Sequence, residues 1–174
     1  MTNEVLKCLE TRRSIRSFAP DMVDEEKLEA ILKAGTYAAC GMGKQAAIIV
    51  AVTDPETREQ LRRMNAEIMG NPDGDPFYGA PVILIVLADR NVRTHVYDGS
   101  LVMGNLMNAA HSLDVDSIWI HRAKEEFDSE EGKALLKKWG IEGDYEGIGH
   151  CALGYRNCEM PEPKPRKENY VYRV

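Results

Sequence analysis

Three arginines within five residues form the densest group of possible ligand-binding side chains in this sequence. They occur in "RRSIR", where Arg12, Arg13 and Arg16 surround Ser14. Guanidinium groups make paired hydrogen bonds to phosphate oxygens, and a serine hydroxyl adds one more donor. The cluster therefore predicts an anion site on a loop, although a solvated basic turn would explain the same residues.

A second basic group lies near the other end of the chain. Lys164, Arg166 and Lys167 occur within a proline-rich segment. Taken alone, a charge run of this kind is usually solvated. It indicates a ligand-binding site only if the fold brings it close to Arg12, Arg13 and Arg16.

Gly41, Gly43 and Ala46 have the spacing G-x-G-x-x-A of a dinucleotide-binding turn. Such a turn follows a strand and opens a helix. Here a helical pattern comes before the glycines and the β-branched run 46–52 comes after them, so the order is reversed. A phosphate loop is also excluded, because Gln45 stands where Ser or Thr would hold magnesium. Neither nucleotide-binding motif is present.

No other residues have the spacing of a hydrolytic or metal site. The chain lacks G-x-S-x-G, and its four histidines lack metal-ligand spacing: His95, His111, His121 and His150. The four cysteines form no C-x-x-C pair and are expected to be reduced thiols. An anion site without an evident acid, base or nucleophile can still catalyse a reaction when a cofactor carries the reactive atom.

The elements that must position these residues follow from apolar periodicity, caps and breakers. Asn71 to Pro76 breaks the pattern and is the expected mobile loop, while the proline-rich tail is expected to be an extended arm that ends in an edge strand at 170–172. Helices are predicted over 3–11, 24–35, 53–69, 98–113 and 128–140, with Asn3, Thr53 and Asp128 as caps of the first, third and fifth. Buried strands are predicted over 46–52, 80–89, 115–120 and 146–153.

Length and charge limit the possible partners. The 174 residues suit one domain, and the net charge of −6 argues against general affinity for nucleic acid or an anionic membrane. No run approaches the roughly 18 apolar residues of a membrane-spanning helix. A cytoplasmic protein that binds small molecules or a second copy of itself is expected.

In the order of its motifs the chain resembles the nitroreductase family of FMN-dependent flavoproteins, specifically its small members. No single motif is decisive, but five occur in the expected order over most of the chain. They are "TRRSIRSF" at 11–18, "AGTYAACGMGKQ" at 34–45, "FYGAPVILIVLAD" at 77–89, "DGSLVMGNLMNAAHSLDVDSIWI" at 98–120 and "GHCALGYRNCEMPEPKPRK" at 149–167.

The resemblance implies which residues hold FMN. Arg12, Arg13, Ser14 and Arg16 would bind its phosphate and ribityl chain, with Lys164 and Arg166 closing from the far end of the sequence. Ala39, Cys40, Gly41 and Met42 would pack on the flavin ring from a partner chain. Asn65 would hydrogen-bond the pyrimidine ring, or be a plain surface asparagine. Trp119, Ile120 and His121 would lie at the reactive edge, with a backbone N–H directed at N5 or O4. His121 is the best candidate for a proton donor, because it is the only titratable side chain in segment 117–121.

The resemblance also implies the architecture. We expect one α+β domain over 1–174, a three-layer α-β-α fold with a mixed central sheet, in an intertwined homodimer that exchanges the C-terminal arm 155–174. Gly43 and Ala46 replace the family's usual Asn and Pro, which predicts a looser turn over the ring. Only residues 70–79 are available as a lid over the substrate.

The function implied is hydride transfer from NADH or NADPH through flavin N5 to an oxidised acceptor such as a nitroaromatic or a quinone, with ping-pong kinetics. Three alternatives stay open. The same fold could support another redox reaction, such as reductive dehalogenation or azoline oxidation, or the chain could be a noncatalytic FMN-binding redox sensor. A structural domain without a cofactor is the third.

Overall fold

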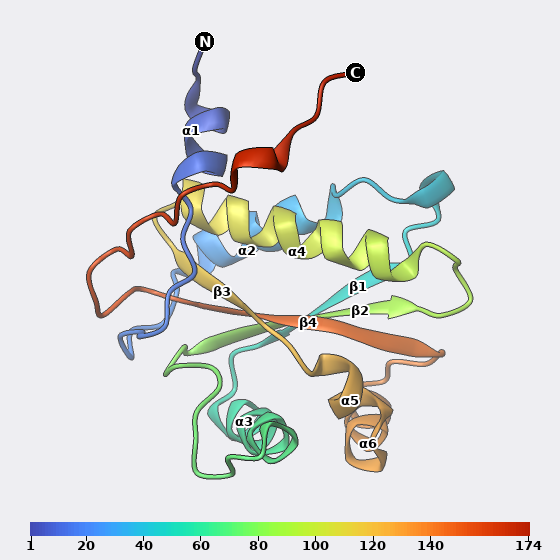
Figure 1. Cartoon of the computed structure of the whole chain (residues 1–174). Helices are drawn as coiled ribbons and strands as arrows, with labels where there is room; N and C mark the ends of the chain where they lie inside the picture. Colours follow the sequence, from blue (N-terminus) through green and yellow to red (C-terminus); the bar gives the residue numbers. More distant parts are fainter.

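The computed structural model describes all residues from 1 to 174 and contains one four-stranded sheet (Figure 1). The strands are β1 (Ala47–Val52), β2 (Val82–Asp89), β3 (Asp116–Ile120) and β4 (Tyr145–Gly154), in the order β1-β2-β4-β3. Each neighbouring pair is antiparallel. The four predicted strands are thus confirmed within one or two residues at their ends.

The expected mixed sheet is wrong for the four strands of one chain. After β1 the chain leaves along α3 (Pro55–Met69), and segment 70–81 brings it back to the end of β1, where Val52 faces Ile83. A helix followed by such a return reverses the strand direction, whereas a parallel pair needs a crossover to the opposite end. One isolated parallel bridge joins Ser14, outside the four strands, to Ser117 of β3.

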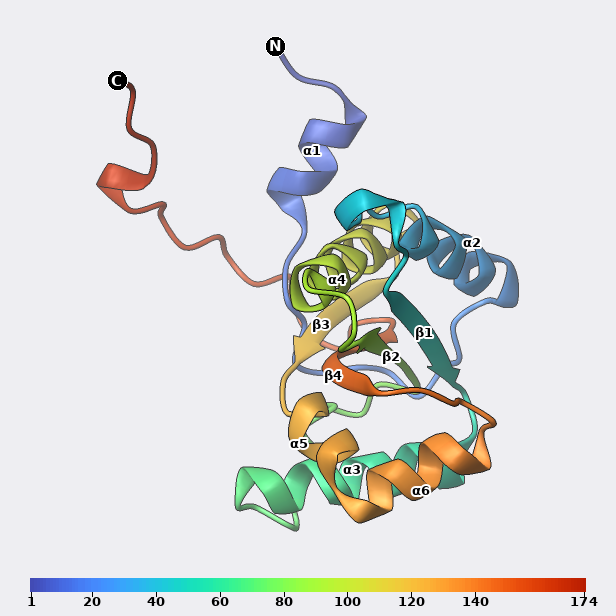
Figure 2. The same ribbon diagram turned by 90° about the vertical axis from the view of Figure 1, so that its right-hand side faces the viewer.

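Helices cover both faces of the sheet, which gives three layers (Figures 1 and 2). On one face lie α2 (Glu25–Thr36) and α4 (His95–Ser112). On the other lie α3, α5 (Ala123–Asp128) and α6 (Glu130–Lys138). The short helix α1 (Glu4–Thr11) stands beyond α4, and its predicted Asn3 cap accepts a hydrogen bond from the Leu6 N–H. None of these helices combines the length and apolar character needed to cross a bilayer.

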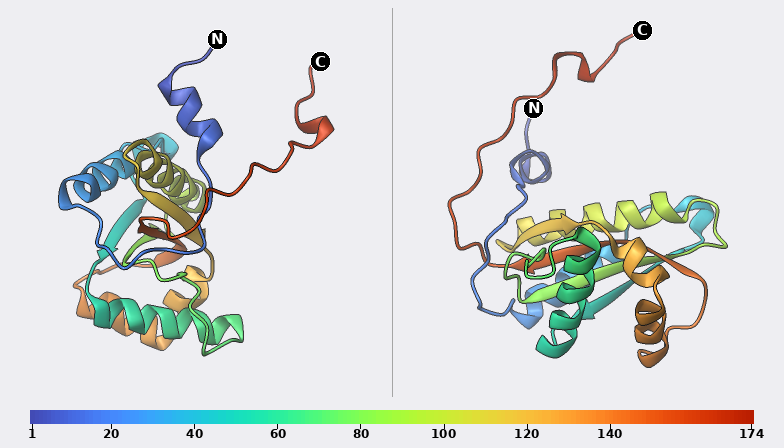
Figure 3. Two further views of the ribbon diagram at one scale, coloured as in Figure 1. Left: turned by 90° about the vertical axis from the view of Figure 1, so that its left-hand side faces the viewer. Right: turned by 60° about the horizontal axis from the view of Figure 1, so that its bottom comes forward.

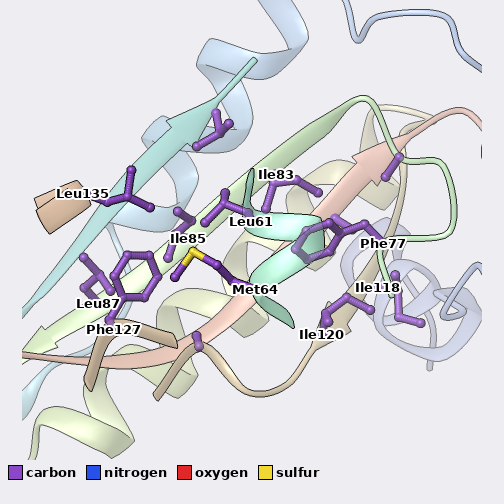
Figure 4. Close-up of a cluster of buried hydrophobic side chains, with 14 of the residues drawn as sticks. Leu61, Met64, Phe77, Ile83, Ile85, Leu87, Ile118, Ile120, Phe127 and Leu135 are labelled. Carbon is purple, nitrogen blue, oxygen red and sulfur yellow. The ribbon is translucent and has the colours of Figure 1, made fainter. Parts of the chain in front are cut away.

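Alternation along β2 divides the core in two. Ile83, Ile85 and Leu87 face α3 and α5, while Val82, Leu84 and Val86 face α2 and α4. Figure 4 shows the first cluster, in which Phe77 and Phe127 lie at opposite ends of the row of β2 side chains. A strand buried on both faces has no polar side, which is why 82–88 is continuously apolar.

Three helix starts differ from prediction, and one of them is that of α4, which begins at His95 rather than Asp98. Asp54, rather than Thr53, caps α3 by accepting from the Thr57 N–H. Ser129, rather than Asp128, caps the helix predicted over 128–140 by accepting from the Gly132 N–H, and the short helix α5 before it was not predicted. Gly132 permits this close turn, since a Cβ there would lie 2.0 Å from the Glu126 carbonyl oxygen.

Strand β1 is an edge strand rather than a fully buried one. Its first four residues are half-buried and Ala51 is exposed. Beyond β2 it has no neighbour in the sheet. One side of β1 therefore presents unpaired backbone groups, which another strand could use.

The C-terminal arm leaves the body of the molecule (Figures 2 and 3). Residues 156–174 are all exposed, and a 3₁₀ turn at Glu168–Tyr170 is their only regular element. The edge strand predicted at 170–172 is not formed within the chain. Isolated extended segments gain too little from local hydrogen bonds to form a strand alone, so a sheet edge must be supplied to them.

Candidate cofactor-binding site

The arginine segment runs beside strand β3. The N–H of Ile15 donates to the Ser117 carbonyl at 3.2 Å, and the Ile15 side chain is fully buried in the core. Ile15 thereby fixes the backbone on both sides of it. Arg12, Arg13 and Ser14 are half-buried, and Arg16 is exposed.

None of the three arginines forms an ion pair, although the chain is acidic overall. By contrast, Arg58, Arg62, Arg63, Arg90 and Arg156 each pair with a carboxylate. The Nη1 of Arg12, the Nε of Arg13 and the Oγ of Ser117 are shielded from solvent without an acceptor. A buried donor left without a partner costs about 1–3 kcal/mol, and more when it is charged. The donor set fits an anion that would satisfy these groups.

His111, on the last turn of α4, adjoins this cluster. Its Nε2 lies 2.9 Å from the Thr11 hydroxyl. Burial lowers its pKa, and the positive charges of Arg12 and Arg13 lower it further against the opposing effect of Asp116. A neutral imidazole here leaves the arginines as the charges that an anion would meet.

Cys151, on β4 opposite Trp119, is not a candidate nucleophile. Burial raises the pKa of its thiol to about 12, and the nearby Arg12 charge opposes this only in part. A nucleophilic cysteine must be a thiolate at the working pH. Cys151 thus acts as a packing residue under the arginine cluster.

The glycine turn lies at the opposite end of α4. Residues Gly41–Gly43 form a 3₁₀ turn in which Met42 has φ 53° and Gly43 has φ 66°. The buried Asp98 holds it, accepting from the Gly41 N–H at 3.0 Å and from the Thr94 hydroxyl at 3.0 Å. A Cβ on Gly41 would lie 2.3 Å from the Thr94 hydroxyl oxygen, so only glycine allows this approach.

The residues just before this turn, Ala38 to Cys40, line a groove of about 1130 Å³ along α2 and β1. Ala39 and Met42 are exposed, Met42 to 85%, while Cys40 is half-buried in the groove. Apolar residues dominate the lining, among them Leu32, Ala38, Ala47 and Ile49. Such a surface suits a flat ring or a neighbouring chain.

Within one chain the glycine turn and the arginines are far apart. Thr11 meets α4 at His111 and Gly41 meets it at Asp98. At a rise of about 1.5 Å per residue, these two points on the helix are separated by roughly 20 Å. The structure therefore does not bring the two groups together within one chain.

The third predicted group is the link from β3 to α5. Trp119 packs on the α4 side, and Gly149 makes room for it, since a Cβ there would lie 2.3 Å from the indole Nε1. Ile120 is buried on the other face, and His121 is exposed. The N–H groups of His121 and Arg122 have no acceptor within the chain. Backbone donors are thus available where the sequence predicted one.

Asn65 is completely buried rather than a surface asparagine. Its Nδ2 donates to the His121 carbonyl at 3.0 Å and to the Glu126 carboxylate, and its Oδ1 accepts from the Arg122 Nε at 2.9 Å. Both amide hydrogens are used inside the protein. In this structure Asn65 contacts the backbone of the β3–α5 link and presents no free donor.

Lys164 and Arg166 are exposed on the arm, and Arg166 donates only to the Lys164 carbonyl. The structure does not join them to Arg12 within one chain. Segment 70–81, which includes the loop 71–76 expected to be mobile, is held against α3: Arg58 bonds Asp75 and the Ala80 carbonyl, and Arg62 bonds two further carbonyls. This segment cannot close over a ligand without breaking those bonds.

Sequence reasoning missed four buried polar residues around the site: Asp98, Ser117, Glu126 and His150. Asp98 was interpreted as the start of a helix and Ser117 as part of a strand. The sequence does contain a signal for His150, because this titratable residue interrupts the apolar run at the end of the strand predicted over 146–153.

Comparisons with known proteins extend over the chain. The family described as "Nitroreductase family" matches residues 9–155. The crystal structure of a nitroreductase with bound FMN from Bacteroides fragilis NCTC 9343 is 28% identical, covers 99% of this chain and 100% of its own, and has a TM-score of 0.90. The corresponding FMN-bound nitroreductase from Desulfitobacterium hafniense DCB-2 is 27% identical over all of both chains, with a TM-score of 0.88. An Archaeoglobus fulgidus protein, provisionally named NADH dehydrogenase/NAD(P)H nitroreductase, is 30% identical over 96% of this chain and 90% of its own.

Proposed function

Because the chain belongs to the nitroreductase family, we propose that it is an FMN-dependent oxidoreductase that uses NADH or NADPH to reduce a small acceptor such as a nitroaromatic or a quinone. The observation that carries this proposal is the set of buried donors without partners on Arg12, Arg13 and Ser117. An acidic chain that leaves these groups uncompensated is suited to a phosphate.

The arginine cluster binds the FMN phosphate. Arg12 and Arg13 supply buried charge, and Ser14 and the exposed Arg16 complete the ring of donors. Lys164 and Arg166, carried on the projecting arm, close on the same phosphate. The Ser117 hydroxyl, which lies beside Ser14, is a donor to the same group.

The working unit is a homodimer. Apolar side chains are exposed along α1 and α4, namely Val5, Leu6, Leu9, Val96, Tyr97 and Leu101. Covering them with a second copy removes an apolar surface unusual for a monomer. The arm of each chain reaches across its partner, and the turn of Ala39, Cys40, Gly41 and Met42 packs on the partner's cofactor. Two copies thereby overcome the separation of roughly 20 Å along α4.

FMN, when bound, supplies a ring that accepts a hydride at N5 and passes two electrons to an acceptor. The chain's own part is to hold and tune that ring. The free N–H groups of His121 and Arg122 would serve the N5 and O4 edge of the ring and would stabilise negative charge on it. The half-buried Trp119 and the groove at the glycine turn exclude water from it.

Donor and acceptor occupy one slot in succession, which gives ping-pong kinetics. His121 is the one titratable side chain of segment 117–121, and its exposure allows it to deliver a proton to the acceptor. Segment 70–79 is too short and too firmly held to enclose a large substrate. Small planar acceptors are accordingly favoured.

The test of this function begins with the purified protein. It should carry the yellow absorption of oxidised flavin, and that absorption should be bleached by NADH or NADPH and restored by an acceptor. A colourless protein that takes up no added FMN would contradict the proposal. A flavoprotein that neither nucleotide reduces would be a sensor or an enzyme with another electron donor.

Replacing Arg12 by Ala tests the phosphate assignment. Loss of one charged hydrogen-bonding partner should weaken FMN binding by about 1.5–3 kcal/mol, a factor of roughly ten to a hundred and fifty. Arg63→Ala is the matched control, because Arg63 is an ion-paired arginine on α3. FMN titration by fluorescence quenching measures both. Equal affinities for the two variants would show that Arg12 does not bind the phosphate.

A further inference from the structure

Four polar side chains from separate parts of the chain meet inside the core beside the β3–α5 link. They are Asn65 on α3, Arg122 at the end of the link, Glu126 on α5 and His150 on β4. Asn65, Glu126 and His150 have no exposed surface. Sequence motifs assign a role only to Asn65, and that role is a different one.

The bonds form a chain that ends on the backbone. His150 Nε2 lies 3.1 Å from Glu126 Oε2, and the other carboxylate oxygen accepts from Asn65 Nδ2. Asn65 Nδ2 also donates to the His121 carbonyl, and Asn65 Oδ1 accepts from Arg122 Nε. Phe77 and Phe127 flank the His150 ring at centroid distances of 5.3 and 6.4 Å. The group is therefore enclosed in apolar surroundings and can transmit its geometry only through Asn65.

Stability alone does not explain such a buried polar cluster. Desolvating a carboxylate and an imidazole is expensive, and apolar residues of similar volume are often as stable or more so. Glu126 Oε2 and both ring nitrogens of His150 have no hydrogen-bond partner. The bonds of Asn65 to Glu126, His121 and Arg122 nevertheless fix one arrangement of the groups that they join. Among these groups is the peptide that joins His121 to Arg122.

That peptide is held in an unusual conformation. Arg122 has φ 78° and ψ 3°, a left-handed geometry that costs a long side chain energy and persists only where its surroundings enforce it. Asn65 bonds both the His121 carbonyl, which precedes Arg122, and the Arg122 guanidinium. The Glu126 N–H donates to the Arg122 carbonyl at 3.0 Å. The Arg122 N–H is the one backbone group of this residue with no partner.

Planarity then determines where that N–H points. In a trans peptide the carbonyl and the following N–H point in opposite directions. Since Asn65 draws the His121 carbonyl inward, the Arg122 N–H is directed away from the core. No other group in the chain fixes the rotation of this peptide.

We propose that Asn65, Glu126 and His150 are positioning residues that orient the Arg122 N–H toward the reduced flavin edge, so that their geometry sets the reduction potential of bound FMN. This inference rests on the proposed function. Asn65 acts on the peptide directly, Glu126 fixes the amide of Asn65, and His150 fixes the carboxylate of Glu126.

Asn65→Asp is the most direct test, since it keeps the size of the side chain but replaces the donor Nδ2 with an oxygen that repels the His121 carbonyl. We expect the preference for reduced over oxidised FMN to fall at least tenfold, which is about 30 mV toward negative potential for a two-electron couple. The affinity for oxidised FMN should change less than threefold, because the phosphate residues are untouched. Dye-equilibrated reductive titration gives the first quantity, and fluorescence titration gives the second.

Glu126 supplies a second pair of variants that does not depend on whether Asn65→Asp folds. Glu126→Leu removes the acceptor for Asn65 and should lower the potential, whereas Glu126→Gln keeps an acceptor oxygen and should restore it. Met64→Leu is the control, because Met64 is a buried neighbour on α3 that packs in the same apolar cluster. It should leave the potential unchanged even if it alters the melting temperature.

The outcomes separate this inference from the function on which it rests. Folded variants that bind FMN at the wild-type potential would overturn the positioning role and leave the oxidoreductase intact. Glu126→Leu and Glu126→Gln with equal potentials would overturn it as well. A wild-type protein that binds no FMN would overturn both.

Discussion

At the scale of single residues, the arginine segment is defined by what it lacks. Five arginines elsewhere in the chain have carboxylate partners, and those of residues 12–16 have none. The sequence identified this cluster by its density. It could not show that Ile15 is buried, which is what turns Arg12 and Arg13 toward shielded positions.

His111 should make stability depend on pH. Its pKa in the folded protein is lowered, mainly by burial, from an ordinary value of 6.5. A lowered pKa means that protonation favours the unfolded chain, so its contribution is complete above about pH 6.5 and is lost as the pH falls toward the folded-state value. Melting temperatures of wild type and His111→Gln across this range measure the effect. The stability of wild type relative to the variant should fall as the pH drops below about 6.5 and be constant well above neutrality.

At the scale of elements, the glycine turn depends on the start of α4. Asp98 accepts hydrogen bonds from the Gly41 N–H and the Thr94 hydroxyl. Gly41 and Asp98 are 57 positions apart, so no local sequence pattern links them. Asp98→Leu keeps the branched shape of the side chain and removes both bonds. Leaving the Gly41 N–H without an acceptor should cost about 1–3 kcal/mol.

Urea unfolding measures that cost, and Ser100→Ala is the control because Ser100 bonds only within its own helix. The Asp98 variant should also lose FMN affinity if the turn packs on the ring. A variant as stable as wild type would show that the turn is held by other contacts.

How far the elements could be predicted depends on the range of the forces that make them. Alternation and caps are local, so the strand over 82–89 and the Asn3 cap follow from a few neighbouring residues. The burial of Asn65 depends on partners 56 to 61 positions away, and no local pattern encodes them. The same is true of the antiparallel direction of β1 and β2, which the return of segment 70–81 decides.

At the scale of the molecule, the body and the arm are different kinds of structure. No buried residue comes after Gly154. A chain truncated after Cys158 should therefore keep its helical circular dichroism and melt cooperatively. If, as proposed, the arm supplies Lys164 and Arg166 to the phosphate and is exchanged between subunits, the truncated chain should lose FMN and the mass of a dimer.

Light scattering after gel filtration, with absorption recorded on the same peak, measures both quantities. Replacing Lys164 and Arg166 by Ala in the full chain removes two positive charges but keeps the arm. It therefore separates the effect of these charges from the effect of truncation. That variant should remain dimeric and lose affinity for FMN. A truncated chain that is still a yellow dimer would show that the arm is not exchanged.

Helix α4 carries a contact for the arginine end at His111 and for the glycine turn at Asp98. If the two ends of α4 contribute to different pockets of a dimer, a substitution near one end in one subunit and a substitution near the other end in its partner must complement each other. Chains carrying Arg12→Ala and chains carrying Asp98→Leu would each be deficient as pure populations. A mixed dimer of the two would place both lesions in one pocket and leave the other wholly wild type. Co-expression should then restore flavin and turnover to one pocket of every hybrid, a result that a site built within a single subunit could never give.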